Sequence, residues 1–146
     1  MTSVSDLPTT HPRQVVAIVL RWHQKVGLFR RSQAVGHDRG LWHCITGYID
    51  PGLDPRTQAL LEVHEETGLR TVDLAALHTG PTLQIGDTGG HQWIVHTFVG
   101  ETMHRRLQLN WEHDRYRWVS PRAVGRYTTV TWLDEVIQAV GAEART

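Results

Sequence analysis

The sequence has very little cysteine: Cys44 is the single cysteine among 146 residues. An internal framework of disulfide bonds, which stabilises many small secreted domains, is therefore excluded. The chain is long enough to bury roughly two thirds of its unfolded surface, so a hydrophobic core can stabilise one domain without such links. Because Cys44 lies in an apolar segment, we expect a buried and unreactive thiol.

The sequence also lacks an excess of charge, since 15 lysines and arginines balance 15 aspartates and glutamates. No general electric field attracts the protein to nucleic acid or to an anionic membrane, so we expect neither partner, and phosphate recognition must be local. The longest apolar run, Val15–Leu20, is too short to span a bilayer. The N-terminus shows no pattern of a cleaved signal peptide. These features predict a soluble, cytoplasmic protein.

Hydrophobic periodicity and turn residues predict one domain over residues 13–142. A flexible lead-in at 1–12 precedes it, and a short tail at 143–146 follows it. Alternating or β-branched segments predict strands at 13–22, 25–32, 41–49, 71–80, 82–86, 91–100, 106–110 and 115–120. Helices are expected over 55–67, just after 120, and over 132–140. Strands before and after a central helix indicate an α+β fold, a mixed β-sheet flanked by helices.

The central helix has strong local end signals. Asp54 is a favourable N-cap, and proline at the next position suits the first turn of a helix. Gly68 is placed to end the helix in the left-handed conformation. We therefore expect a helix from Pro55 to about Thr67, with Val63 on its apolar face.

Three glutamates, Glu62, Glu65 and Glu66, lie close together on this helix. Two of them are in the last turn, where the helix dipole favours cations, and like charges at this spacing repel one another. Such breaks of local rules are expected at functional sites. An acidic face exposed to solvent is one explanation. The other is a site for a hard divalent cation such as Mg²⁺, which takes oxygen ligands and often shares them with substrate phosphates.

A longer pattern favours the metal site. It reads G-x5-E-x7-R-E-U-x-E-E-x-G-U, in which U is aliphatic, and it is matched by Gly47, Glu62, Val63, Glu65, Glu66, Gly68 and Leu69. The chain therefore resembles the Nudix hydrolases from Gly47 to Leu69. Segments outside this box, such as 41–52, 112–124 and 127–140, are similar to the subgroup that includes dihydroneopterin triphosphate and deoxynucleoside triphosphate pyrophosphohydrolases.

The resemblance implies an α/β/α sandwich and Mg²⁺-dependent cleavage of a small nucleoside polyphosphate or diphosphate derivative by water attack on phosphorus. Mn²⁺ is a possible substitute for Mg²⁺. By position in the box, Glu62 and Glu66 would be metal ligands, and Glu65 a further ligand or a water-orienting base. The backbone carbonyl of Gly47 or of the residue before it would be another ligand. Glu112 would be a downstream ligand or general base.

Two positions depart from the Nudix box. Leu53 replaces its first glutamate and Leu61 its arginine. Replacing both members of a buried ion pair by apolar residues is often neutral or stabilising, so we expect Leu53 to pack near Leu61. The alternative is that the metal site has decayed, leaving a Nudix-fold module that binds a nucleotide or metabolite without catalysis.

Four further residues are candidates for substrate binding. Arg30 and Arg31 could contact phosphates, since the guanidinium group matches phosphate oxygens, but strand alternation allows only one of them to face a cleft. Trp42 and His43 precede the box and are candidates for stacking on a base. A solvent-exposed or structural role is the alternative for each.

The remaining aromatic and imidazole side chains favour structural roles. The 10 histidines show no spacing typical of a zinc site. Core or interface packing is expected for Trp93, Trp111, Trp118 and Trp132. A Trp-rich surface in the second half of the chain could form a homodimer, but core packing explains these residues equally well.

Overall fold

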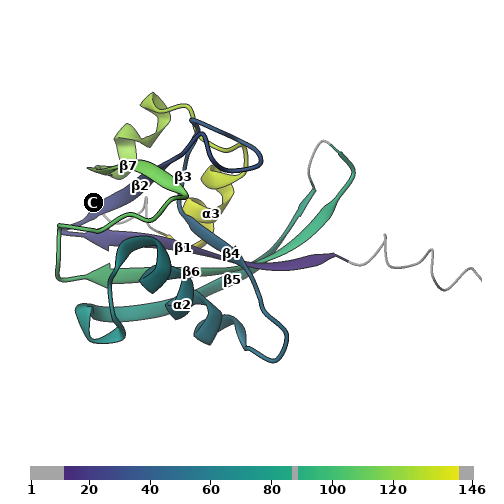
Figure 1. Cartoon of the computed structure of the whole chain (residues 1–146), viewed down its shortest axis with the longest axis horizontal. Helices are drawn as coiled ribbons and strands as arrows, with labels where there is room; N and C mark the ends of the chain where they lie inside the picture. Colours follow the sequence, from purple (N-terminus) through teal and green to yellow (C-terminus); the bar gives the residue numbers. More distant parts are fainter. Residues whose placement is uncertain (1–11, 87–88, 142–146) are drawn as a thin grey trace, which may run out of the picture.

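The computed structural model describes residues 12–86 and 89–141. Its centre is a mixed seven-stranded sheet, with α2 (Pro55–Thr67) on one face and α3 (Leu133–Ala139) on the other (Figure 1). The strands are β1 (Arg13–Trp22), β2 (Lys25–Arg31), β3 (Trp42–His43), β4 (Ile45–Tyr48), β5 (Leu74–Gly86), β6 (Gln92–Thr102) and β7 (His113–Val119). This arrangement confirms the predicted fold class. The predicted tail and most of the predicted lead-in lie outside the described residues.

Strand β1 is the centre of the core because both of its faces are apolar. Side chains alternate between the faces of a strand, so Val16, Ile18 and Leu20 pack in the cluster that contains residues of α2. The intervening residues, Val15, Ala17 and Val19, pack in the cluster that contains residues of α3. The continuous apolar run in the sequence is therefore explained by a strand that is covered on both faces.

The sheet forks along one edge of β1. Residues 15–18 of β1 pair with β4, whereas its last two residues pair with β2, which in turn pairs with β3 and β7. Strand β6 runs parallel to β1 along the other edge and pairs with β5. Gly47 on β4 lies opposite Val16 and therefore next to the middle of the sheet. The fork places the start of the Nudix-like box beside α2.

Helix α2 has the predicted ends. The Asp54 side chain accepts a hydrogen bond from the Thr57 amide at 2.7 Å, and Gly68 ends the helix in the left-handed region with φ 77°. The face that packs on the sheet includes Ala59 and Val63, as expected, but it also buries polar side chains. These buried polar residues are Gln58, Glu62, Glu66 and Thr67.

Replacing Asp54 by alanine is expected to lower the free energy of unfolding by about 1 kcal/mol, because the Thr57 amide loses its capping partner. Chemical denaturation at neutral pH measures the change. Asp134→Ala, an exposed substitution in the first turn of α3 that removes no N-cap hydrogen bond, is the control. Equal effects of the two substitutions would contradict a capping role for Asp54.

Three segments differ from the sequence-based expectation. Residues 71–86 contain one long strand, β5, instead of two, and its pairing with β6 is interrupted by a register shift near Pro81, which cannot donate a backbone hydrogen bond. The expected strand at 41–49 is divided at Cys44. Residues 106–110 form no strand. There the Gln108 amide donates to the Thr67 carbonyl at the end of α2, at 2.9 Å.

Cys44 is buried, as predicted, with 1% of its surface exposed. Burial raises the pKa of its thiol far above the usual range, so the reactive thiolate is not populated at neutral pH. Among the described residues, no helix is both long and apolar enough to cross a membrane.

Candidate active site

Gly47 on β4 lies directly against the carboxylate of Glu62 on α2. A Cβ atom added at Gly47 would overlap both carboxylate oxygens of Glu62. Glu62 is also held from its own helix, because Gln58 Nε2 donates to Glu62 Oε2 at 2.8 Å. Gln58 Oε1 in turn accepts from the Asp50 amide at 2.9 Å. One side chain thus connects the box loop to α2 and orients the carboxylate of Glu62.

Glu66 is the most deeply buried carboxylate of the site. It is 1% exposed, and its Oε2 atom has no hydrogen-bond partner within the described residues. Burial raises the pKa of Glu66 well above its usual value, and the hydrogen bond to Glu62 and the charge of Glu112 raise it further. Leaving a buried acceptor without a hydrogen bond costs folding free energy. This oxygen is therefore free to bind a ligand in place of the water it has lost.

His113 at the start of β7 lies beside Glu66, with 3.7 Å between His113 Nδ1 and Glu66 Oε1. Burial and the positive charge of Arg31 lower the pKa of His113 to about 4. The imidazole is therefore uncharged at neutral pH and does not compensate a negative charge on Glu66. It packs against the ring of Phe29, with 5.5 Å between the ring centroids.

Glu65 and Glu112 complete the acidic group, although both are more exposed than Glu62 and Glu66. Both backbone groups of Glu112 are hydrogen-bonded. Its amide donates to Asn110 Oδ1 at 3.0 Å, and its carbonyl accepts from the Ser32 amide at 2.8 Å. Burial is the main cause of the raised pKa of Glu62, and the charges of Glu65 and Glu112 add to it. Glu62 and Glu66 therefore feel the charges of Glu65 and Glu112 as well as each other.

These residues fit a hard divalent cation. Among residues 12–86 and 89–141, no three aspartate, glutamate, histidine or cysteine side chains already form a ligand cluster. Mg²⁺ commonly takes one or two carboxylates and completes its shell with waters and substrate oxygens. The unpartnered oxygen of Glu66 and the close approach of the Gly47 backbone to Glu62 provide oxygen donors at one place.

A cavity of about 450 Å³ opens beside the box. Its wall includes Gly47 itself, the guanidinium-bearing Arg31, the imidazole of His43 and the indoles of Trp93 and Trp132. This volume lies within the range of small-molecule sites, and the wall combines aromatic surface with a few polar groups, as such sites do. The cavity therefore has the size and lining of a small-molecule site.

The structure separates the two arginines that were predicted as phosphate contacts. Arg31 lines the cavity, whereas Arg30 forms an ion pair with Asp114 at 2.7 Å and is not among the lining residues. Trp42 also lies outside the cavity wall. It packs against Tyr127 with 5.1 Å between ring centroids, and the Arg30 guanidinium lies over its ring.

His43 lines the cavity and is 2% exposed, and neither of its ring nitrogens has a hydrogen-bond partner within the described residues. Its ring meets Trp132 edge to face, at 4.6 Å and 88°. Burial and the charge of Arg31 lower the pKa of His43 to about 3, so the imidazole is neutral at physiological pH.

The other tryptophans occupy different environments. Trp118 and Trp132 pack against the two core clusters, as expected. Trp93 packs on the core and also lines the cavity. Trp111 does not pack in the core, because it is 66% exposed, and its packing at an interface stays a prediction. It immediately precedes Glu112. The Ser32 hydroxyl donates to the Trp111 carbonyl at 2.7 Å and thus fixes the backbone beneath this exposed ring.

The two leucines that depart from the box do not form a buried apolar pair. Leu61 is 41% exposed, Leu53 is half-buried, and neither belongs to a described core cluster. The exposure of Leu61 shows that its side chain is not on the buried face of α2. Contact between Leu53 and Leu61 stays a prediction.

The NUDIX domain family model matches residues 10–140 of the chain. The chain belongs to the Nudix family. An RNA pyrophosphohydrolase of Gluconacetobacter diazotrophicus is 30% identical over 138 residues, covering 82% of this chain and 81% of that protein. The chain is accordingly a Nudix hydrolase, of the class that acts on phosphorus anhydrides, and this family generally uses a divalent metal such as Mg²⁺.

Solved structures of Nudix proteins share the fold. The MutT protein of Methanosarcina mazei superposes with a TM-score of 0.76 at 22% identity, covering 92% of this chain and 97% of that one. The dihydroneopterin triphosphate pyrophosphohydrolase of E. coli gives a TM-score of 0.72 at 20% identity, covering 89% and 94%. At these identities the comparison shows a common architecture.

Two residues of this Nudix site were not predicted from the sequence. Gln58 lies four residues before Glu62, a helical spacing that places the two side chains together, so its contact could have been inferred. His113 lies 47 positions after Glu66 in the chain, and only the packing of β7 beside α2 brings them within 3.7 Å. No local pattern indicates that contact.

Replacing His43 by asparagine is expected to make the Nudix domain less sensitive to acid. In the folded protein the pKa of His43 is lowered to about 3, whereas its ordinary value is 6.5. Between these two pH values the unfolded chain carries a proton on His43 that the folded chain does not. The free energy of unfolding therefore falls as pH decreases below 6.5. Between pH 7 and pH 4.5 the wild type should lose about 2 kcal/mol more than the variant. Urea unfolding at both pH values measures this difference. The exposed His78→Asn is the control, and equal losses in wild type and His43→Asn would contradict the prediction.

Proposed function

We propose that the chain is a divalent-metal-dependent pyrophosphohydrolase that cleaves a nucleoside triphosphate, or another nucleoside-diphosphate-linked compound, by water attack on phosphorus. The supporting observation is the burial of Glu62 and Glu66 on one helix, with Glu62 against the backbone of Gly47, which lines a cavity of about 450 Å³. Buried carboxylates raise one another's pKa when no cation is near, and a dication with a polyphosphate removes that repulsion.

Glu62 and Glu66 would hold Mg²⁺, or Mn²⁺ in its place, with Glu65, Glu112 and the backbone carbonyl at Gly47 as further ligand candidates. When bound, this ion neutralises phosphate charge and makes a bound water more acidic. The helix that carries three of the glutamates is capped at both ends, so these carboxylates are held on a rigid element.

Proton transfer from the attacking water is assigned to a glutamate outside the buried pair. Glu65 and Glu112 are the candidates, because both are more exposed than Glu62 and Glu66 and can meet a water molecule that enters from solvent. The fixed backbone of Glu112 favours a constant position for its carboxylate. Both alternatives use a carboxylate next to the buried pair.

The cavity is proposed to hold the base and the phosphate chain. Arg31 is placed to bind phosphate oxygens, and Trp93 and Trp132 offer aromatic surface to a planar ring. The uncharged His43 can donate one hydrogen bond and accept another. Arg30 and Trp42 would support this wall from behind, because they pack against each other and against neighbouring residues.

The second candidate is a Nudix-fold module that binds a nucleotide or metabolite without cleaving it. Leu53 and Leu61, which replace charged residues of the box, favour this alternative. Retention of Glu62, Glu65 and Glu66 favours the enzyme, since these residues destabilise their helix when no cation is bound.

A substrate panel with the full chain in Mg²⁺ or Mn²⁺ tests the proposal. The panel contains nucleoside triphosphates, dinucleoside polyphosphates, nucleotide sugars and a 5′-triphosphorylated RNA oligonucleotide, because one relative is named an RNA pyrophosphohydrolase. Hydrolysis in ¹⁸O-labelled water should place the label on a phosphorus of the product. Product formation that depends on the metal and is lost in Glu62→Gln supports the enzyme. Ligands that raise the melting temperature without product above the Glu62→Gln background would establish the binding module.

A further inference from the structure

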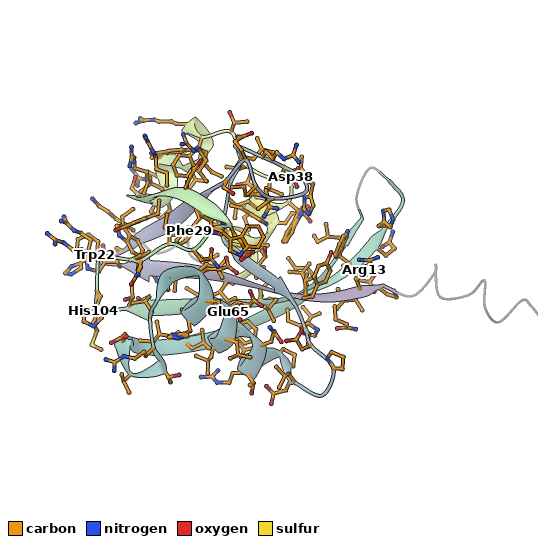
Figure 2. All side chains as sticks on the ribbon, viewed as in Figure 1. Arg13, Trp22, Phe29, Asp38, Glu65 and His104 are labelled. Carbon is orange, nitrogen blue, oxygen red and sulfur yellow. The ribbon has the colours of Figure 1, made fainter. Side chains whose placement is uncertain are left out.

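A second hollow, of about 710 Å³, lies away from the box. Among its lining residues are the aromatic Trp22, Tyr116 and Trp118. Five of the residues that line it are cations, and we call them the basic surface: Lys25, Arg105, Arg106, Arg115 and Arg117. Figure 2 shows side chains with nitrogen tips gathered around Trp22 at one end of the sheet, whereas Glu65 lies near the middle of the molecule.

The basic surface lacks internal compensation. Among the ion pairs of the described residues, none includes any of its five members. The acidic residue in the wall, Asp114, is paired with Arg30 at 2.7 Å. Like charges gathered in this way repel one another, and the chain as a whole has a formal net charge of 0. Positive charge is therefore concentrated on this surface. A polyanion is the partner that would compensate it and relieve the repulsion among the five cations.

Two aromatic rings lie beside one of these cations, Arg105. Trp22 and Trp118 are 6.0 Å apart, and the Arg105 guanidinium lies 5.9 Å from the Trp22 ring centroid. Trp118 is held in place because its Nε1 donates to the Arg105 carbonyl at 2.8 Å. Gly27 leaves room for the same ring, since a Cβ added there would lie 3.1 Å from it. The Trp118 ring is thus held in place beside Trp22 and Arg105.

We propose that the basic surface binds single-stranded nucleic acid, with its phosphates on cations of this surface, Arg105 and Arg106 first, and a base beside Trp22 and Trp118. Cationic grooves with interleaved aromatic rings bind single strands because every base presents a flat face, which a duplex keeps inside its stack. This binding does not depend on the hydrolytic reaction, since Gly47, Glu62 and Glu66 do not line this hollow. The proposal departs from the expectation of no nucleic-acid partner. That expectation used the net charge of the chain, which does not show where positive charges are concentrated on the surface.

Fluorescence anisotropy of a labelled 5′-hydroxyl RNA oligonucleotide, titrated with the full chain, tests the proposal. This probe carries no phosphoanhydride, so failure of the proposed hydrolase does not affect the result. Arg105→Glu with Arg106→Glu should weaken binding by at least about tenfold and reduce the salt slope by roughly 1.4, since each neutralised phosphate of a single strand contributes about 0.7. Arg122→Glu with Arg126→Glu, exposed and outside the hollow, has the same charge change and should leave binding near the wild-type value.

Trp22→Leu separates stacking from charge, and it should weaken binding with an unchanged salt slope. Circular dichroism checks each fold, and Arg115→Glu with Arg117→Glu replaces the first pair if that variant unfolds. Absence of RNA binding at low salt would overturn the proposal, and so would equal weakening by the control pair. Binding to phosphatidylserine vesicles that RNA does not displace, with the same dependence on Arg105 and Arg106, would assign the surface to a membrane and also overturn it.

Discussion

Glu66→Gln is expected to reduce hydrolysis by about 10²–10³-fold while leaving the metal-free fold at least as stable as the wild type. Catalysis should fall because a neutral amide replaces the buried carboxylate proposed as a metal ligand. Stability should rise because burial raises the pKa of Glu66, so its charged form disfavours the folded state. Because the pKa of Glu66 is raised on folding, the free energy of unfolding of the wild type falls as pH increases above 4.5. The stability gained in Glu66→Gln should therefore appear only above pH 4.5.

Thermal unfolding with and without Mn²⁺ distinguishes the two effects. The wild type should gain stability from the metal, by about 2.7 kcal/mol at a hundredfold excess over the dissociation constant, and Glu66→Gln should not. Glu135→Gln, an exposed substitution on α3, is the matched control for loss of one glutamate. Full activity of Glu66→Gln, or an equal metal-dependent gain, would remove this residue from the metal site.

Gly47→Ala is expected to lower activity by roughly 100-fold, even though alanine adds a single methyl group. The backbone at Gly47 is not in the left-handed region, so the obstacle is space and not conformation. The added Cβ would overlap the Glu62 carboxylate, which would have to move and lose its hydrogen bond from Gln58. Overpacking of this kind also destabilises by about 1–3 kcal/mol.

Initial rates and urea unfolding of the same samples measure both effects of Gly47→Ala. Gly125→Ala is the control, because no atom lies within 4 Å of a Cβ added there and its φ is not positive. Glu62→Asp in the Gly47→Ala background shortens the side chain and should restore part of the lost stability without restoring activity. An active, stable Gly47→Ala would show that the approach of β4 to Glu62 does not position this carboxylate.

The features predicted correctly from the sequence depend on neighbouring residues. The ends of α2 follow from Asp54 and Gly68, whose preferences for capping and for left-handed backbone act within one turn. The position of β1 follows from its continuous apolar run, and the grouping of Glu62 with Glu66 follows from helical spacing. None of these inferences requires knowledge of a distant contact.

The features that were missed depend on register and on the packing of distant segments. The choice between Arg30 and Arg31 required the orientation of β2 relative to the cavity, which alternation alone leaves open. The division of strand 41–49 at Cys44 likewise depends on how the sheet forks, because the residues before Cys44 pair with β2 and those after it with β1. The exposure of Trp111 depends on the path of the loop before β7, whose Gln108 amide bonds to the end of α2.

The sequence by itself determined the α+β fold, the bounds of the carboxylate helix and the family pattern that begins at Gly47. Only the tertiary structure decided that Glu66 lies beside His113, that Gly47 leaves no space beside Glu62, and that positive charge gathers around Trp22 in a chain without net charge. The physical reason is the range of the interactions. Capping, periodicity and spacing act over a few residues, whereas burial, pKa shifts and local charge depend on which distant segments pack together.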